Sequence, residues 1–383
     1  MTDVAEEREV EIDTKRAARS QASARRAAII EVVVLYAVCI AAALVLAAIL
    51  VAATGGSWRD VFSALLDGSI RRPGRWGLTL GTALPLLLVA LGTIVNARAG
   101  LVNIGQEGQL LIGAACATYV GVRLGGPGPV VIVALLLAGV LGGAVWAGIA
   151  GALRYWRGVP EVLSTLLLVT VAANAVGYGL KNPSLLLAPA AGRANRNQVS
   201  EQLADDTRLP RITVFGNEFP ISVLLGIALA GAVAFVLART VPGFRLRMLG
   251  RNPRTAQRAG VSATRYGMGA MLISGGFAGL AGAAMLAGGD FGNYQLVPGF
   301  SVNIGWTGLL VALVARERAV AAISVAFVFA SLRTGSGFLA ATGVERRITD
   351  VVQALLVLAL LIPPAVIYIR SRRRALAASK DRV

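Results

Sequence analysis

Few side chains in this sequence could carry out chemistry, and their spacing indicates binding rather than catalysis. The chain has no histidine, the commonest general base near neutral pH and the commonest metal ligand. Its two cysteines, Cys39 and Cys116, each lie inside an apolar run and lack metal-binding spacing. No His-Glu-x-x-His, Gly-x-Ser-x-Gly or Gly-x-x-x-x-Gly-Lys-Ser/Thr pattern occurs. We therefore expect no catalytic residue, no metal site, no cofactor and no ATP-binding site on this chain.

The densest group of polar side chains inside an apolar run is VNIGQEGQL, residues 102–110. Asn103 is predicted to cap a helix, with Gln106 closing a capping box. Glu107 is the only acidic residue well inside an apolar run in the first half of the chain, where a carboxylate is costly unless it faces a cavity, a partner or the interface. Two interpretations of Glu107 stay open: a buried structural pair with Asn103, or one wall of a translocation path.

Part of this motif recurs as VNIGWTGLL, residues 302–310. Five predicted spans separate the two starts, so the copies would run in opposite directions across the membrane, as in an inverted-topology repeat of spans 2–5 and 7–10. Coincidence in a chain rich in Val, Gly and Leu is the competing interpretation. Candidates for a solute path are the polar residues of both copies and one asparagine of the fifth span, each with a structural role as an equally strong alternative: Asn103, Glu107, Gln109, Asn174, Asn303 and Trp306. The indole could stack on a base or a sugar ring.

A second motif, RNPRTAQRAG at residues 251–260, has the signals of a short helix with both ends capped. Asn252 suits an N-cap, Pro253 suits the first turn, and Gly260 stands where a residue with positive φ often follows a helix. A helix of about two turns is too short to be stable alone in water. Its exposed face would carry three cations, Arg251, Arg254 and Arg258. A solvated loop is the simpler interpretation, but the double capping favours a docking element.

Long apolar helices must position both motifs. The chain has 383 residues, of which 56% are hydrophobic and only 15% charged, against about 25% charged in soluble domains. This composition predicts an all-α integral membrane protein with about ten transmembrane helices. The ten apolar runs are 29–53, 78–97, 101–122, 128–152, 161–180, 220–239, 267–288, 301–316, 319–335 and 349–369.

The distribution of positive charge predicts the topology. With both termini in the cytoplasm, the inner segments carry 24 of the 37 Lys and Arg residues. The resulting organisation is a cytoplasmic tail over 1–28, a transmembrane domain over 29–370 and a basic cytoplasmic tail over 371–383. Within the domain, the segment 240–266 is an inner loop and 181–219 is the longest outer loop. The net charge of +17 is explained by this topology, so we expect no nucleic-acid partner.

Four stretches resemble a known family: AGLVNIGQEGQLLIGA, PEVLSTLLL, GRNPRTAQRAGVSATRYGMGAMLISGGFAGLAGA and GFSVNIGWTGLLVALVAR. They look like the permease subunits of bacterial ABC importers for simple sugars and nucleosides, with branched-chain amino-acid permeases as more distant relatives. The resemblance covers about residues 78–370 and is weakest in 181–219 and at Trp306–Thr307. It implies that 252–260 is a coupling helix, which seats in a groove of a separate ATPase subunit.

The resemblance further implies an importer subunit in the bacterial cytoplasmic membrane, with no ATPase site of its own. It implies four kinds of partner: a cytoplasmic ABC ATPase, a second permease subunit in a heterodimer, an extracytoplasmic solute-binding lipoprotein, and membrane lipid. The solute would be a nucleoside or a simple sugar. An ion-coupled secondary transporter is the alternative, since inverted repeats suit it equally well.

Overall fold

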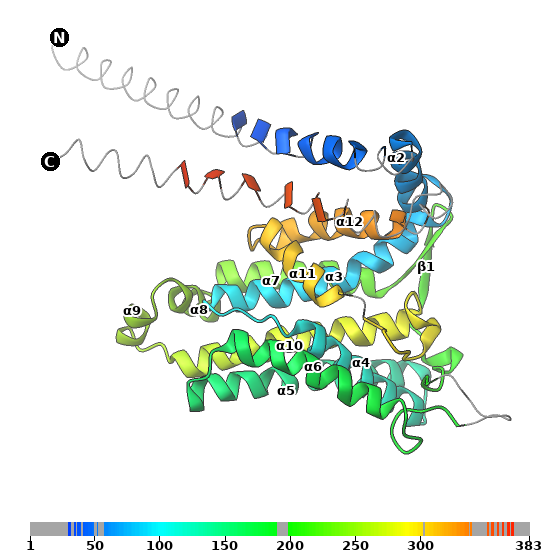
Figure 1. Cartoon of the computed structure of the whole chain (residues 1–383). Helices are drawn as coiled ribbons and strands as arrows, with labels where there is room; N and C mark the ends of the chain where they lie inside the picture. Colours follow the sequence, from blue (N-terminus) through cyan, green and yellow to red (C-terminus); the bar gives the residue numbers. More distant parts are fainter. Residues whose placement is uncertain are drawn as a thin grey trace, which may run out of the picture. The chain divides into compact units, whose positions relative to one another are not determined.

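The computed structural model describes residues 57–189, 198–301, 303–336 and 338, together with scattered positions in 30–52 and 351–370. The chain forms two compact units, Phe62–Phe338 and the pair Met1–Val61 with Leu339–Val383. The predicted tails 1–28 and 371–383 lie outside the described residues, and the predicted first and last spans are described only in part. The fold below is that of the unit Phe62–Phe338, whose helices Figure 1 labels.

Two buried helices form the centre of this unit. Helix α3 (Arg75–Arg98) and helix α10 (Ala263–Gly288) are apolar over most of their length, and 89% and 78% of their apolar 18-residue stretches are buried. Helix α10 packs against α3, α4 (Gln106–Arg123) and α5 (Gly128–Arg157). Glycines let these helices approach closely, because a Cβ at Gly143 would lie 2.7 Å from the Cα of Gly279.

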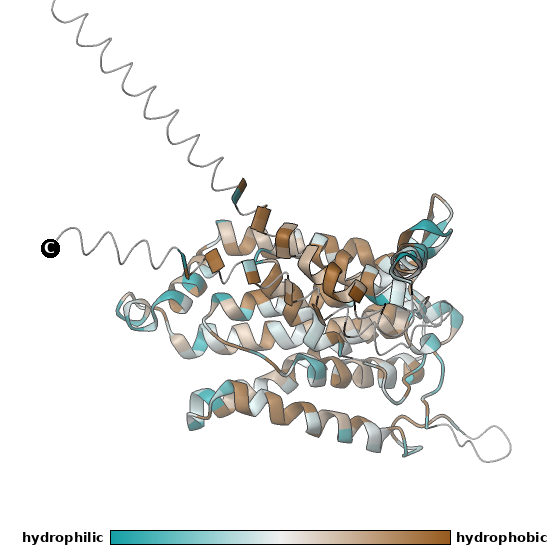
Figure 2. Cartoon of the chain, turned by 45° about the horizontal axis from the view of Figure 1, so that its top comes forward, coloured by the Kyte–Doolittle hydropathy of each residue, from teal (hydrophilic) through white to brown (hydrophobic). Residues whose placement is uncertain are grey.

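Four more helices surround this centre: α5, α6 (Glu161–Gly179), α7 (Ser222–Arg239) and α12 (Ala319–Ser336). The corresponding apolar 18-residue stretches of these helices are only 28–33% buried. On α5 the exposed face carries Val130, Val133, Leu137, Leu141 and Val145, all 55–64% exposed. Figure 2 shows how apolar residues run along the long helices. An apolar exterior of this kind suits a lipid environment.

Six helices of the described residues are therefore long and apolar enough to cross a membrane: α3, α5, α6, α7, α10 and α12. Two predicted spans are shorter than expected. Run 101–122 begins with five irregular residues before α4, and run 301–316 contains only α11 (Ile304–Val314). The predicted turn between α11 and α12 is present at residues 315–317.

The remaining elements lie at the ends of the long helices. Helix α2 (Trp58–Leu66) is followed by a π-helical turn, η1 (Asp67–Arg71). The outer loop contains a 3-10 turn, η2 (Asp205–Thr207), and an antiparallel hairpin of β1 (Arg211–Val214) and β2 (Asn217–Pro220), which the sequence analysis missed. A further 3-10 turn, η3 (Gly292–Tyr294), follows α10. The predicted inner loop contains α8 (Val241–Arg251) and α9 (Pro253–Arg258).

Candidate functional site

The irregular segment 101–105 is the backbone of the central site. Its backbone donors are satisfied by neighbouring helices: Val102 N donates to Glu161 Oε1 at 3.4 Å, and Ile104 N to Thr165 Oγ1 at 3.4 Å. Such backbone is tolerated at membrane depth only when protein groups replace water in this way. Glu161, which accepts from Val102, is also paired with Arg154 across the α5–α6 turn.

The predicted capping box at this segment is wrong. Helix α4 begins at Gln106 with Gly105 as its N-cap residue, and no side chain caps it. Asn103 Oδ1 instead accepts the Gly105 N–H at 3.0 Å, which stabilises the turn before the helix. Gln106 points away from the helix start: its amide nitrogen donates to Val89 O at 3.0 Å, and its oxygen accepts from Thr93 Oγ1 at 2.7 Å.

A buried network of amides and hydroxyls surrounds Asn103. The Asn103 amide donates to Gln109 Oε1 at 2.8 Å and to Ser274 Oγ at 3.0 Å, and the Gln109 amide donates back to Asn103 Oδ1 at 3.1 Å. Gln106 reaches the same Ser274 hydroxyl at 3.2 Å. Each of these four side chains is at most 2% exposed. A network this buried and this well satisfied holds α3, α4 and α10 in a fixed arrangement.

Glu107 bridges the two copies of the repeated motif. Its Oε1 accepts the Asn303 N–H at 3.1 Å, and its Oε2 accepts the Gly305 N–H at 2.6 Å. The carboxylate, 7% exposed, therefore binds the first backbone donors of α11, where the helix dipole also favours an anion. Of the two interpretations of Glu107, a buried pair with Asn103 is not what the structure shows: the carboxylate binds the second motif, 196 and 198 residues away in sequence.

The other predicted solute-path residues lie apart from this network. Asn303 is exposed, in a left-handed conformation with φ 59°, and Trp306 is half-buried on α11. Asn174 is exposed on α6 and donates to Thr170 O in its own helix. The structure thus brings Asn103, Glu107 and Gln109 together with the second motif, and leaves the side chains of Asn174, Asn303 and Trp306 accessible.

Sequence reasoning did not single out Thr93 or Ser274. It expected Gln106 to cap the helix, whereas Gln106 bonds to both of these side chains. A usable signal was present for Ser274, which is the only side chain with a strong hydrogen-bonding group between residues 267 and 288. Among the described residues no group of three or more His, Cys, Asp or Glu gathers to hold a metal ion. The chemistry available at the site is hydrogen bonding to a polar molecule.

The second site is the segment between α7 and α10. As predicted, Asn252 caps α9, because its side chain accepts the Thr255 N–H at 3.2 Å. Gly260 follows the helix with φ 79°. The fully buried Ala256 fixes α9 onto a small core with Leu249 and Val261.

The cations of this segment face outward. Arg251, Arg254 and Arg258 are exposed, and none of them forms a salt bridge with a described residue. A hollow of about 260 Å³ lies beside them, lined by Phe244, Arg247, Met248, Arg251, Asn252 and Thr255. Within the described part of the chain, the buried Arg247 Nε has no hydrogen-bond partner. This surface is therefore cationic and hollowed, and one buried guanidinium nitrogen beneath it lacks a hydrogen-bond partner among the described residues.

The two sites are joined through glycine backbone. A Cβ at Gly100 would lie 3.0 Å from the Cα of Gly250, and a Cβ at Gly250 would lie 2.8 Å from Gly100 N. The end of α8 thus packs directly on the turn that leads into segment 101–105. Beside this contact, Arg98 Nη2 donates to Glu317 O at 2.7 Å, which ties the α11–α12 turn to the same end of α3.

At the opposite end, an ion pair holds the hairpin. Arg211 Nη1 donates to Asp290 Oδ1 at 3.0 Å and to Gly288 O at 3.0 Å. The Asp290 side chain is only 8% exposed, and this burial raises the pKa of its carboxyl above the usual value although Arg211 acts in the opposite direction. The pair joins β1 to the end of α10.

Comparison with known proteins identifies the family. The model described as branched-chain amino acid transport system, permease component, matches residues 77–361. The glucose ABC transporter permease protein TsgB13 of Haloferax volcanii is 33% identical over 75% of this chain and 76% of its own. The guanosine ABC transporter permease protein NupP of Bacillus subtilis is 31% identical over 78% of this chain and 84% of its own. The nucleoside ABC transporter permease protein NupB of Lactococcus lactis is 26% identical over 84% of this chain and 88% of its own.

These matches agree with the fold. A multi-pass protein of the plasma membrane is expected from six long apolar helices and from relatives that are ABC permeases, whose partners are an ATPase subunit and a solute-binding protein. They give no support to the ion-coupled alternative. The chain therefore belongs to the family of permease components of branched-chain amino acid transport systems, and it is a transport subunit of an ABC importer.

Proposed function

We propose that this permease translocates a nucleoside or a simple sugar, delivered by an external solute-binding lipoprotein and driven by a cytoplasmic ABC ATPase that grips α9. The capped, outward-facing α9 is the observation that carries the proposal. Only Ala256 of this helix is buried, so Arg254 and Arg258 are available to a partner. Acidic side chains on an ATPase would complement these cations and the unsatisfied Arg247.

The solute path is proposed to include Asn103, Glu107, Gln109, Asn174, Asn303 and Trp306. Asn103, Glu107 and Gln109 are already engaged in internal hydrogen bonds, so we assign them the positioning of α4 and α11. Asn174, Asn303 and Trp306 have accessible side chains and are the better candidates for solute contact. Amides would bind hydroxyl or base edges, and the indole would stack on a ring.

The finer architecture is part of this proposal. We place ten spans in the membrane, related by an inverted repeat of spans 2–5 and 7–10, with both termini in the cytoplasm. The meeting of the two VNIG segments through Glu107 supports the repeat, since segments related by such symmetry face one another at the midplane. A second permease subunit in a heterodimer and surrounding lipid complete the assembly, which has no nucleic-acid partner.

The docking role of α9 is tested by reversing its charge. Arg254→Glu with Arg258→Glu should abolish co-purification with the ATPase subunit and reduce ATP-driven uptake more than about ten-fold, because two attractions become repulsions. Arg157→Glu, an exposed change at the predicted inner end of α5, is the control and should retain both. An intact complex with full uptake in the double variant would overturn the proposal.

The solute class is tested separately. Membrane vesicles with the complete transporter should take up labelled guanosine or labelled glucose, and an excess of the unlabelled solute should compete. Trp306→Leu should raise the half-saturating concentration about ten-fold by removing ring stacking, whereas complex formation should be unchanged. Uptake of neither solute would refute the assigned class without affecting the docking result.

A further inference from the structure

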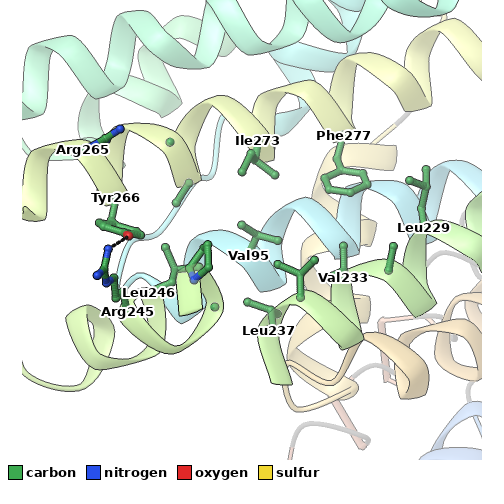
Figure 3. A pocket seen from close by; sticks show the side chains of 16 residues that line it. Val95, Leu229, Val233, Leu237, Arg245, Leu246, Arg265, Tyr266, Ile273 and Phe277 are labelled. Carbon is green, nitrogen blue, oxygen red and sulfur yellow. Dashed lines mark hydrogen bonds between the residues drawn. The ribbon is translucent and has the colours of Figure 1, made fainter. Parts of the chain in front are cut away.

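An apolar cavity lies between α3, α7, α8 and α10, and none of its lining residues belongs to the buried polar network or to the hollow beside α9. It has a volume of about 590 Å³, and thirteen of its sixteen lining residues are apolar. Figure 3 shows Val95, Val233 and Phe277 among the residues that line it. Val95 and Val233 are buried, but Val236 and Ile273 are 44% and 50% exposed, so the cavity opens sideways from the helix bundle.

The three polar lining residues gather at one end. Arg245 of α8 and Arg265 and Tyr266 of α10 lie at the same end of the cavity, where Arg245 Nη1 donates to Tyr266 Oη at 3.1 Å (Figure 3). Both arginines are exposed, and neither forms a salt bridge within the described residues. Among the described residues, this cationic end of the cavity therefore has no counter-ion.

The length of the cavity matches one leaflet of a membrane. Arg265 and Phe277 mark its two ends along α10, and twelve residues of α-helix rise about 18 Å. Half of a bilayer hydrocarbon core is about 15 Å thick. The cationic end adjoins α8 and α9, on the side predicted to be cytoplasmic, where anionic lipids bind basic pockets between transmembrane helices.

We infer that this cavity binds an anionic phospholipid of the inner leaflet, with one acyl chain between α7 and α10 and the phosphate at Arg245, Arg265 and the Tyr266 hydroxyl. Charge selects the headgroup, because two guanidinium groups that form no salt bridge with a described residue favour an anionic headgroup over one that also carries a cation. The apolar walls select the chain, because lateral opening allows a lipid to enter from the bilayer.

The headgroup contact is tested on the full-length chain in detergent, titrated with phosphatidylglycerol or phosphatidylcholine and followed by native mass spectrometry. Phosphatidylglycerol should bind more tightly. Arg245→Gln with Arg265→Gln should weaken its binding about twenty-five-fold, at about five-fold for each arginine. The matched control, Arg157→Gln with Arg239→Gln, removes the same charge from exposed positions outside the cavity and should change binding less than two-fold or so.

The acyl-chain contact is tested by filling the cavity. Gly269 lines it, and a Cβ there would meet nothing within 4 Å, so Gly269→Leu extends into the free space without a clash. Phosphatidylglycerol binding should fall about ten-fold. Gly231→Leu on the exposed face of α7, where a Cβ also meets nothing within 4 Å, is the control and should bind normally.

Each other outcome overturns the inference. Equal binding of both phospholipids, or equal loss in the two double-arginine variants, would mean a non-selective surface. Competition by glycerol phosphate alone would mean a free-phosphate site. If Gly269→Leu lowers thermal stability and leaves lipid binding unchanged, a segment of this chain fills the cavity instead.

Discussion

The two VNIG motifs share their letters and differ in what surrounds them. In the first, Asn103 is 2% exposed and takes part in four hydrogen bonds; in the second, Asn303 is exposed in a left-handed turn. The first motif provides a carboxylate from Glu107, and the second provides the backbone N–H groups that bind it. The position equivalent to Glu107 is Thr307, whose hydroxyl donates to Asn303 O at 2.7 Å within its own helix.

This difference shows how one sequence pattern serves two roles. The first motif fixes the protein's internal geometry, because its polar groups are consumed by neighbouring helices. The second keeps its asparagine and its indole accessible while its backbone is held in place. The two similar motifs of this chain therefore lie next to each other in the fold. Whether the polar side chains of a copy are buried or exposed decides which copy has the structural role.

The largest effect is expected at the contact between the motifs. Gly305→Ala would place a Cβ 2.6 Å from the Cα of Glu107, so the two helix starts must separate. We expect a loss of about 3 kcal/mol in the free energy of unfolding and a loss of uptake. Gly231→Ala, in open space on α7, should be neutral or stabilising in the same thermal unfolding assay. Equal behaviour of the two variants would refute the close contact.

The two asparagines should respond unequally. Asn103→Ala leaves the Gln109 side chain and the Gly105 N–H without a partner, removes one of the two hydrogen bonds to Ser274 Oγ, and should cost about 2 kcal/mol. Asn303→Gly preserves the positive φ and should change stability by less than about 0.5 kcal/mol. Thermal unfolding and uptake should be measured on both. A large loss of uptake in a stable Asn303→Gly variant would assign that side chain to the solute.

Glu107→Gln sharpens the comparison with a smaller change. The amide retains one acceptor oxygen and presents its NH₂ group to a backbone donor, so one of the two N–H groups of α11 loses its partner. We expect a cost of about 1.5 kcal/mol. Thr307→Val, which removes only a bond within the second motif, should cost about 1 kcal/mol or less in the same assay. The reverse order would contradict the bridging role.

The smallest effect is expected at Asp290, where burial opposes the charge. Because burial raises the pKa of Asp290 in the folded state, the folded chain binds a proton more readily than the unfolded chain, and its stability should fall slightly as pH rises through that window. Asp290→Asn should flatten this dependence and change stability by less than about 1 kcal/mol near neutral pH. Unfolding midpoints between pH 4 and about 8 would check it; an increase of stability with pH that depends on Asp290 would refute the assignment.

The short-range features of this fold could be predicted from sequence, and the long-range ones could not. The cap at Asn252 and the glycine at Gly260 follow from residues within one helical turn, so α9 was predicted within one residue. The cap expected at Asn103 is wrong because its side-chain oxygen accepts from the Gly105 N–H and the Gln109 amide, while its NH₂ group is held by Ser274 on α10. The hairpin in the outer loop was missed, although Gly216 in its turn, with φ 73°, was a usable signal.

The same limit applies to the candidate site. Polar residues inside apolar runs pointed to Asn103, Glu107 and Gln109, because burying a polar group costs free energy unless it is hydrogen-bonded. Their partners depend on which helices meet, and that is set by glycine packing across α5 and α10 rather than by any local pattern. Asn174 shows the ambiguity of this signal, because an amide in an apolar run can also donate to the backbone of its own helix.

The backbone contact between Gly100 and Gly250 bears on how fast and how far movement is transmitted. No side chain lies between α8 and the turn at residue 100, so no rotamer change can absorb a displacement there. If the proposed ATPase moves α8, the displacement would reach the turn at residue 100 directly, three residues before Asn103. Substituting Gly100 or Gly250 would separate α8 from this turn before it altered the polar network around Asn103 or the surface of α9.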